Sequence, residues 1–153
     1  SVRYPRGSGP NVQVNSGLEV LEIGKANMIR EGSSKVIFLN FGSLLHEAIE
    51  VSEKLDLTLI DMRFVKPLDK DILRKYLPSA ELFVSLEDGS IAGGAGSSVQ
   101  EFCSEENILI QSKLLGIPDK FIEHASRDEM IEEVGLTARQ IEESLRQLIE
   151  VLQ

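Results

Sequence analysis

The sequence has little of the chemistry that marks several large classes of protein. Its 153 residues include one cysteine, Cys103, and two histidines. A single cysteine cannot form an internal disulfide, and so few His and Cys ligands exclude the spacing of a structural zinc site. No apolar run approaches the ~20 residues of a membrane span, and nothing at the start resembles a charged-then-apolar leader. We therefore expect a cytoplasmic protein with no membrane partner.

Basic residues are also few. The chain has 16 Lys and Arg against 25 Asp and Glu, a formal net charge of −9. Nucleic-acid binding needs clustered basic side chains that displace counterions, so this balance excludes a polyanion partner. A small phosphorylated ligand stays possible, because one or two well-placed arginines suffice for it.

The first 17 residues, SVRYPRGSGPNVQVNSG, are rich in Gly, Pro, Ser and Asn and show no apolar period. This composition is typical of a linker or of the tail of a preceding unit. The chain opens on Ser1 and its first methionine is Met28, so we expect a piece of something larger. Residues 18–32 favour a short β-hairpin or an irregular strand pair.

From residue 34 onward, apolar runs alternate with segments of helical spacing. We predict buried strands at 36–41, 57–62, 81–86 and 108–115, each followed by a helix. Such alternation predicts an α/β fold, a three-layer α/β/α domain whose mostly parallel sheet has about five strands.

Polar residues at fixed spacing predict where three helices begin. Asp69 is placed to cap a helix after the second strand. Ser126 and Glu129 form a capping-box pair, and Thr137 and Gln140 form another at the start of the last helix.

The glycine-rich stretch EDGSIAGGAGSS follows the third strand and invites comparison with a phosphate loop. It has neither the G-x-G-x-x-G spacing nor a Walker lysine, and Glu87 and Asp88 at its mouth would repel a phosphate. We interpret residues Gly89–Gly96 as a tight strand-to-helix connection, with a subunit or domain contact as the second choice.

Four further residues are candidates for chemistry. Asp61 and Arg63 end the second strand, where α/β sheets present functional groups; they can pair with each other, or Arg63 can pair with Asp69. His46 is interpreted as an exposed helix residue, and His124, in a loop, as a structural or interface residue.

Arg3 and Arg6 flank Tyr4–Pro5 in the opening segment. Pro5 restricts one backbone dihedral and Gly7 frees another, so a short bend can hold the Arg6 guanidinium, a group suited to bidentate phosphate recognition. The residues alone favour an ordinary linker arginine.

In order and spacing, several stretches resemble the C-terminal end of the 1-deoxy-D-xylulose-5-phosphate synthase family. They are RYPRGSG (3–9), LEIGKA (21–26), FLNFGSLLHEA (38–48), LIDMRFVKPLD (59–69), LEDGSIAGGAGSSVQEF (86–102) and GIPDKFIEHASRDEM (116–130). The resemblance covers nearly the whole chain with consistent order and spacing. It is specific because DMRFVKPLD (61–69), YPRG (4–7) and GIPDKFIEH (116–124) occur together, whereas any one of them alone would be weak.

The resemblance implies a transketolase C-terminal-type domain at 18–153, preceded at 1–17 by the tail of a pyrimidine-binding domain. It implies a homodimeric transferase that condenses pyruvate with glyceraldehyde 3-phosphate and releases CO2, using thiamine diphosphate and Mg²⁺. The cofactor and catalytic residues would lie in the preceding domains, so this chain alone would bind no cofactor and be inactive. One site residue carries over: Arg6, which would contact the substrate phosphate.

Three alternatives stay open. The first is the C-terminal docking domain of a 2-oxo acid dehydrogenase beta subunit, although the stretches 61–69 and 4–7 disfavour it. The second is a non-enzymatic α/β interaction module. The third, a small nucleotide-binding protein, requires the glycine-rich stretch to bind phosphate.

Overall fold

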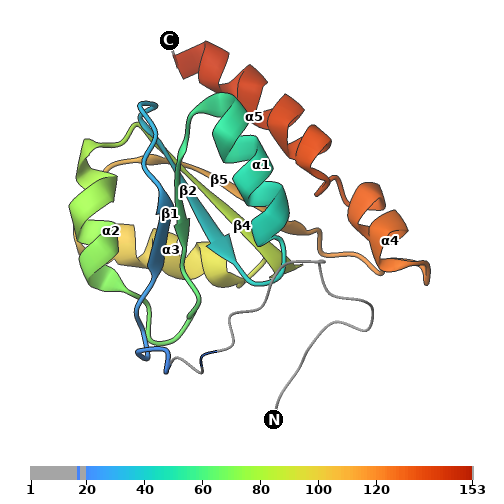
Figure 1. Ribbon diagram of the computed structural model, residues 1–153, viewed down its shortest axis with the longest axis horizontal. Helices are drawn as coiled ribbons and strands as arrows, with labels where there is room; N and C mark the ends of the chain where they lie inside the picture. The colour runs from blue at the N-terminus through green and yellow to red at the C-terminus, as the bar shows by residue number, and fades with distance from the viewer. Residues whose placement is uncertain (1–16, 18–19, 153) are drawn as a thin grey trace.

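The computed structural model describes residue 17 and residues 20–152 (Figure 1). The elements follow in the order β1 (Asn27–Arg30), β2 (Val36–Phe41), α1 (Leu45–Leu55), β3 (Thr58–Asp61), α2 (Lys70–Tyr76), the short 3-10 helix η1 (Leu77–Ser79), β4 (Leu82–Ser90), α3 (Ala95–Glu105), β5 (Gln111–Ile117), α4 (Arg127–Glu133) and α5 (Ala138–Leu152).

The five strands form one sheet in the order β1-β3-β2-β4-β5. Strands β3, β2, β4 and β5 run parallel, and β1 pairs antiparallel with β3 at one edge. The expectation of a hairpin within residues 18–32 is therefore wrong: within the described part of that stretch there is one strand, and its partner is β3. Local alternation suggested a hairpin, but the open edge of the parallel sheet supplies a better partner for the backbone groups of β1.

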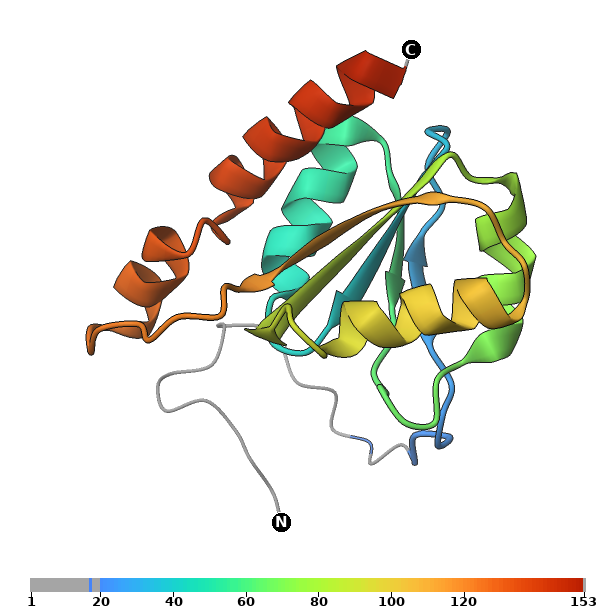
Figure 2. The same ribbon diagram turned by 180° about the vertical axis from the view of Figure 1, so that it is seen from behind.

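Helices cover both faces of the sheet, as Figures 1 and 2 show from opposite sides. Because successive side chains of a strand point to opposite faces, the apolar run of β2 feeds two cores. Val36 and Phe38 pack with α1 and α5, whereas Ile37, Leu39 and Phe41 pack with α2 and α3. The predicted α/β/α architecture with a mostly parallel five-stranded sheet is confirmed.

Two strands, β4 and β5, differ from the prediction by more than one residue at an end. Strand β4 continues to Ser90, so the first residues of the glycine-rich stretch extend the sheet. Strand β5 begins at Gln111 rather than at residue 108. The Ile108 backbone N–H donates to the Cys103 carbonyl and closes the end of α3, and the Leu109 side chain is fully exposed. Residues 108–110 therefore belong to the end of α3 and to the loop that connects it to β5, not to the strand.

The three predicted helix starts are confirmed. The Asp69 side chain accepts a hydrogen bond from the Ile72 N–H at the start of α2. Ser126 and Glu129 form a complete capping box at α4. Before α5, Thr137 and Gln140 hydrogen-bond each other's backbone N–H.

Candidate functional site at the carboxyl edge of the sheet

The carboxyl ends of the parallel strands β2, β3 and β4 lie together at one end of the strands, the lower end in Figure 1, which we call the carboxyl edge. Helix α1 begins beside this edge, and the loops after β3 and β4 leave from it. Open α/β sheets bind ligands at this edge, because loops there can present side chains without disturbing the core. Most of the polar candidates named from the sequence lie here.

Asn40, Asp61 and Arg63 form a chain of contacts across β2 and β3. The Asn40 side chain is fully buried, and its Nδ2 donates to Asp61 Oδ1 at 3.3 Å. The other carboxylate oxygen, Asp61 Oδ2, lies 3.9 Å from Arg63 Nε. The predicted pairing of Asp61 with Arg63 is therefore confirmed. A 3.9 Å contact is a loose ion pair, which leaves guanidinium donors for another acceptor.

The backbone at Arg63 has an unusual conformation. Its φ is 56°, in the left-handed region that non-glycine residues rarely adopt. The Phe64 N–H donates to the Met62 carbonyl at 2.5 Å, so a three-residue turn closes around Arg63. Such strained turns cost of order 1–3 kcal/mol and concentrate at functional sites. The turn directs the chain away from the sheet at the point where the arginine stands.

The position of the Glu87 side chain explains why glycine is needed in the stretch that follows it. Its carboxylate is buried, with 6% of the residue exposed, and it accepts hydrogen bonds from the N–H groups of Ala95 (2.9 Å) and Gly96 (3.1 Å). These are the first residues of α3, where a phosphate loop would bind its anion. A Cβ at Gly94 would lie 2.4 Å from Glu87 Oε2, so only glycine lets the carboxylate approach. The chain's own carboxylate fills this position, which supports the strand-to-helix connection over a phosphate loop.

Asp88, the next residue, joins three segments at the same edge. Ser43 Oγ donates to Asp88 Oδ2 at 2.7 Å, and Arg127 Nη2 donates to Ser43 Oγ at 3.1 Å. These contacts connect the end of β4 to the start of α1 and the start of α4. A Cβ at Gly42 would meet Asp88 Oδ1 at 2.6 Å, so glycine is needed there as well.

Asp69 does not pair with Arg63, so the second pairing considered from the sequence is not formed. It is buried, and besides capping α2 it accepts a hydrogen bond from the Ala26 N–H at 2.9 Å. Lys25 Nζ lies 4.0 Å from it and 3.1 Å from Asp71. Asp69 thus ties the loop before β1 to the loop after β3, which is a structural role.

The histidines and the cysteine show no catalytic arrangement. His46 in α1 and His124 in the loop after β5 are both exposed, and neither makes a hydrogen bond or ion pair within the part of the chain that the structure describes. Cys103 is buried in α3, and burial raises the pKa of its thiol. A raised pKa lowers the thiolate fraction, so this cysteine serves as a core residue.

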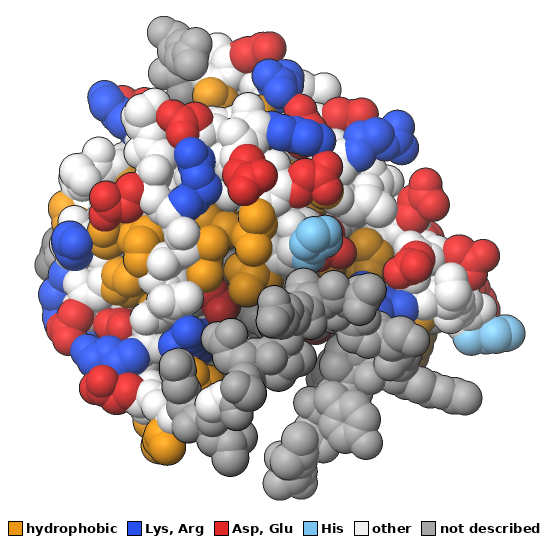
Figure 3. All heavy atoms as spheres, in the orientation of Figure 1, with side chains coloured by type: hydrophobic (Ala, Val, Ile, Leu, Met, Phe, Trp, Pro, Cys, Tyr) orange, Lys and Arg blue, Asp and Glu red, His pale blue; other side chains and the backbone are white. Residues whose placement is uncertain are grey.

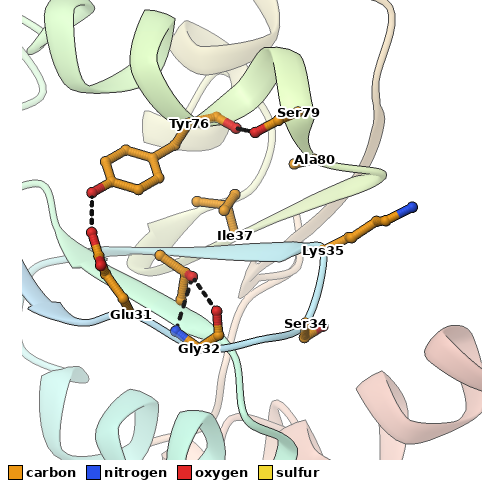
Figure 4. Close-up of a pocket in the computed structure, with 9 residues that line it drawn as sticks. Glu31, Gly32, Ser34, Lys35, Ile37, Tyr76, Ser79 and Ala80 are labelled. Atoms are coloured by element: carbon orange, nitrogen blue, oxygen red, sulfur yellow. Dashed lines mark hydrogen bonds between the residues drawn. The ribbon is translucent and has the colours of Figure 1, made fainter.

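A hollow of about 310 Å³ lies at the opposite edge, near the amino ends of β2 and β4 (Figure 4). Its polar groups are already paired: Tyr76 Oη donates to Glu31 at 2.5 Å, and the Gly32 N–H donates to Thr58 Oγ1 at 3.1 Å. In Figure 4 the Lys35 side chain points away from the hollow. This edge offers a ligand little that is unpaired, so we place the candidate site at the carboxyl edge.

Arg6, the substrate-phosphate residue expected from the resemblance, lies outside the described residues, as do Arg3 and Tyr4. Sequence reasoning missed the roles of Asn40 and Glu87. For Asn40 a signal existed, because a polar residue inside the apolar run VIFLNF must find a partner when buried. For Glu87 the signal was ambiguous, because a carboxylate beside a glycine-rich turn can face solvent as easily as a helix N-terminus.

Two kinds of feature are absent from the part of the chain that the structure describes. Among residues 17 and 20–152, no group of three or more His, Cys, Asp and Glu side chains is arranged to hold a metal ion. None of the helices in the same part of the chain has the length and apolar character needed to cross a membrane.

Comparison with known proteins places the chain in a family. Residues 24–141 match the family described as "Transketolase, C-terminal domain". A solved structure titled "Split gene transketolase, inactive beta4 tetramer" superposes with a TM-score of 0.75 and 29% identity, over 83% of this chain and 43% of that one. The chain belongs to the transketolase C-terminal domain family.

Curated relatives are more specific. The chain is 51% identical over 152 residues to 1-deoxy-D-xylulose-5-phosphate synthase of Stutzerimonas stutzeri, and 48% identical over 152 residues to that of Pseudomonas fluorescens strain Pf-5. Each alignment covers 99% of this chain and 24% of the relative. The chain thus spans about a quarter of the length of these synthases and corresponds to their C-terminal domain, which confirms the resemblance.

Proposed function

We propose that this chain is the C-terminal domain of a 1-deoxy-D-xylulose-5-phosphate synthase, an enzyme of the cytoplasm that condenses pyruvate with glyceraldehyde 3-phosphate and releases CO2. The observation that carries the proposal is the 51% identity over 99% of the chain. Identity of this extent favours the synthase over a 2-oxo acid dehydrogenase beta subunit. Residues 1–17 are then the tail of the preceding pyrimidine-binding domain, and 18–153 are the domain itself.

In this proposal the chain contributes recognition of the acceptor's phosphate, from its opening segment and from its domain. Arg6 is the first contact, on the strength of the YPRG stretch. Arg63 is a second candidate, because it stands at the carboxyl edge on a strained turn and is paired only loosely, at 3.9 Å, with Asp61. Charge-assisted hydrogen bonds from arginine to phosphate are frequently bidentate, so they fix both the position and the orientation of the acceptor. The binding energy of the remote phosphate would hold the aldehyde in place for reaction.

Thiamine diphosphate and Mg²⁺ belong to the rest of the proposed enzyme, where the cofactor supplies the electron sink for decarboxylation and carbon–carbon bond formation. The described residues of this chain do not fit either group. The N-terminus of α3 is filled by the Glu87 carboxylate, and the described residues offer no metal-binding cluster. In this proposal the residues of the domain carry out no chemical step; they bind and orient the acceptor.

An apolar rim supports contact with the preceding domains. Leu21 (52% exposed), Ile23 (73%) and Val65 (40%) stand on the two loops that Asp69 ties together at the carboxyl edge. In Figure 3, hydrophobic side chains also gather over β1, between α1 and α2. Clustered exposed apolar side chains mark a covered surface. Three-quarters of the synthase chain lies outside this domain, so the occupant we propose is that part of the same enzyme, which also forms the homodimer.

The phosphate role is tested in the intact enzyme that contains this domain. Arg6→Ala should lower kcat/KM for glyceraldehyde 3-phosphate by at least ~10-fold, because a hydrogen bond to a charged group contributes about 1.5–3 kcal/mol. Unchanged kinetics would remove Arg6 from the site.

The rim is tested by Ile23→Asp and Val65→Asp in the same enzyme. Each should lower the thermal midpoint and speed hydrogen exchange of the loops at 20–26 and 63–69. Leu109→Asp is the matched control, because Leu109 is fully exposed but precedes β5 at the opposite edge. Equal effects at all three positions would contradict contact at the rim.

A further inference from the structure

Asn40 is an exception among the residues of β2. The other five residues of this strand are apolar and buried, and an apolar side chain at position 40 would fill the same space without polar groups to satisfy. Asn40 Nδ2 donates to Asp61 Oδ1 at 3.3 Å and to the Gly42 carbonyl at 3.2 Å. Its Oδ1 is buried and, among the described residues, accepts no hydrogen bond. A buried polar group that is only partly satisfied needs an explanation other than packing.

The contacts of Asn40 end on one oxygen of Asp61. Asn40 holds Oδ1 of that carboxylate, and Oδ2 is the oxygen nearest to Arg63 Nε. Only 17% of the Asp61 side chain and 32% of the Arg63 side chain are exposed. Within the described part of the chain, Arg63 makes no other ion pair. The orientation of its guanidinium therefore depends on a carboxylate that a buried amide holds from behind.

We propose that Asn40 and Asp61 are positioning residues, which hold the Arg63 guanidinium at the carboxyl edge for the phosphate of the acceptor substrate. The inference rests on the proposed function, and specifically on Arg63 as a phosphate contact. The turn at Met62–Phe64 fixes the backbone of Arg63, and the Asn40–Asp61 pair holds a carboxylate beside its side chain. A preformed guanidinium loses less conformational freedom when it binds an anion.

The readout is phosphate selectivity, defined as kcat/KM for glyceraldehyde 3-phosphate divided by kcat/KM for glyceraldehyde, measured in the intact enzyme. Asp61→Asn and Asn40→Ala should each lower this ratio by about 10-fold through a higher KM for the phosphorylated acceptor, since small misplacements of a binding group are costly. The KM for pyruvate and kcat/KM for glyceraldehyde should stay within about twofold, because neither involves the phosphate.

Asp61→Asn is nearly isosteric and partly exposed, so it keeps the test valid if Asn40→Ala does not fold. Asp88→Asn is the matched control: Asp88 is an acid at the same edge, but it contacts Ser43 rather than Arg63. Its phosphate selectivity should equal that of the wild type. A purely structural role for Asn40 or Asp61 would lower the rates with both acceptors and leave the ratio unchanged.

Arg63→Ala separates the two levels of the proposal. If this variant retains full phosphate selectivity, Arg63 is not a phosphate contact, and the inference falls with that part of the proposed function. If Arg63→Ala loses selectivity while Asp61→Asn and Asn40→Ala keep it, only the positioning role is overturned. A rise in selectivity in Asp61→Asn also overturns it, because Asp61 would then compete with the phosphate for Arg63.

Discussion

Replacing Glu87 by alanine should destabilise this domain more than any other exchange of a carboxylate at the sheet edge. The buried Glu87 side chain accepts hydrogen bonds from the N–H groups of Ala95 and Gly96 and stands at the positive end of α3. Its loss leaves two N–H groups without acceptors in a region that excludes water. Losing a helix cap costs about 0.5–2 kcal/mol, and a partly buried charge at a helix end adds up to ~2 kcal/mol. We expect a loss of about 3 kcal/mol for Glu87→Ala.

The assay is urea and thermal unfolding of the 153-residue chain. For a domain of this size, about 3 kcal/mol corresponds to a fall in Tm of roughly 6–12 °C. Glu101→Ala is the control, because Glu101 is an exposed residue of the same helix. That exchange should stay within about 0.5 kcal/mol of the wild type. If both variants unfold at the same urea concentration, the carboxylate does not cap α3 and the reasoning about the glycine-rich stretch is refuted.

Two further predictions concern stability. Hydrogen bonds from Ser33 and Arg30 lower the pKa of Asp56 to about 2 from 3.8. A pKa that is lowered in the folded state stabilises the fold above pH 3.8, and this stabilisation is lost as the pH falls toward 2. The difference in unfolding free energy between wild type and Asp56→Asn, measured by urea titration, should therefore shrink over that interval. A constant difference would contradict the lowered pKa. Gly94→Ala should destabilise the chain more than Gly93→Ala, because a Cβ at Gly94 would lie 2.2 Å from a backbone carbonyl oxygen. At Gly93, with φ 70°, nothing lies within 4 Å of a Cβ, so only the ~1–2 kcal/mol of left-handed backbone strain applies. Equal unfolding midpoints for the two variants would contradict this.

The layers of the fold could be predicted from the sequence because strong local patterns and the tertiary structure agree. The run 36–41 is apolar at five of six positions, which requires burial on both faces, and the caps at Asp69 and Ser126 mark helix starts by short-range chemistry. The boundaries of β4 and β5 were less accessible. Whether Glu87–Ser90 continues the sheet depends on pairing with β2 at Glu87 and with β5 at Ser90, which is not a local property.

The candidate site was only partly predictable for a related reason. Asp61 and Arg63 could be placed at a strand end from their order in the chain, and their pairing followed from proximity. The link from Asn40 to Asp61 requires that β2 and β3 be adjacent and in register, with Asn40 opposite Asp61. No local pattern specifies that register. The left-handed backbone at Arg63 was equally inaccessible, since arginine has no preference for it.

The central claim is that this chain recognises the acceptor's phosphate while the cofactor is held elsewhere in the enzyme. One comparison tests it most directly. Wild-type and Arg6→Ala forms of the intact enzyme are assayed for phosphate selectivity, and the Kd for thiamine diphosphate is measured by calorimetry on the same preparations. The account predicts that selectivity falls by at least ~10-fold while the cofactor Kd is unchanged. Full selectivity in the variant, or loss of cofactor binding, would contradict it.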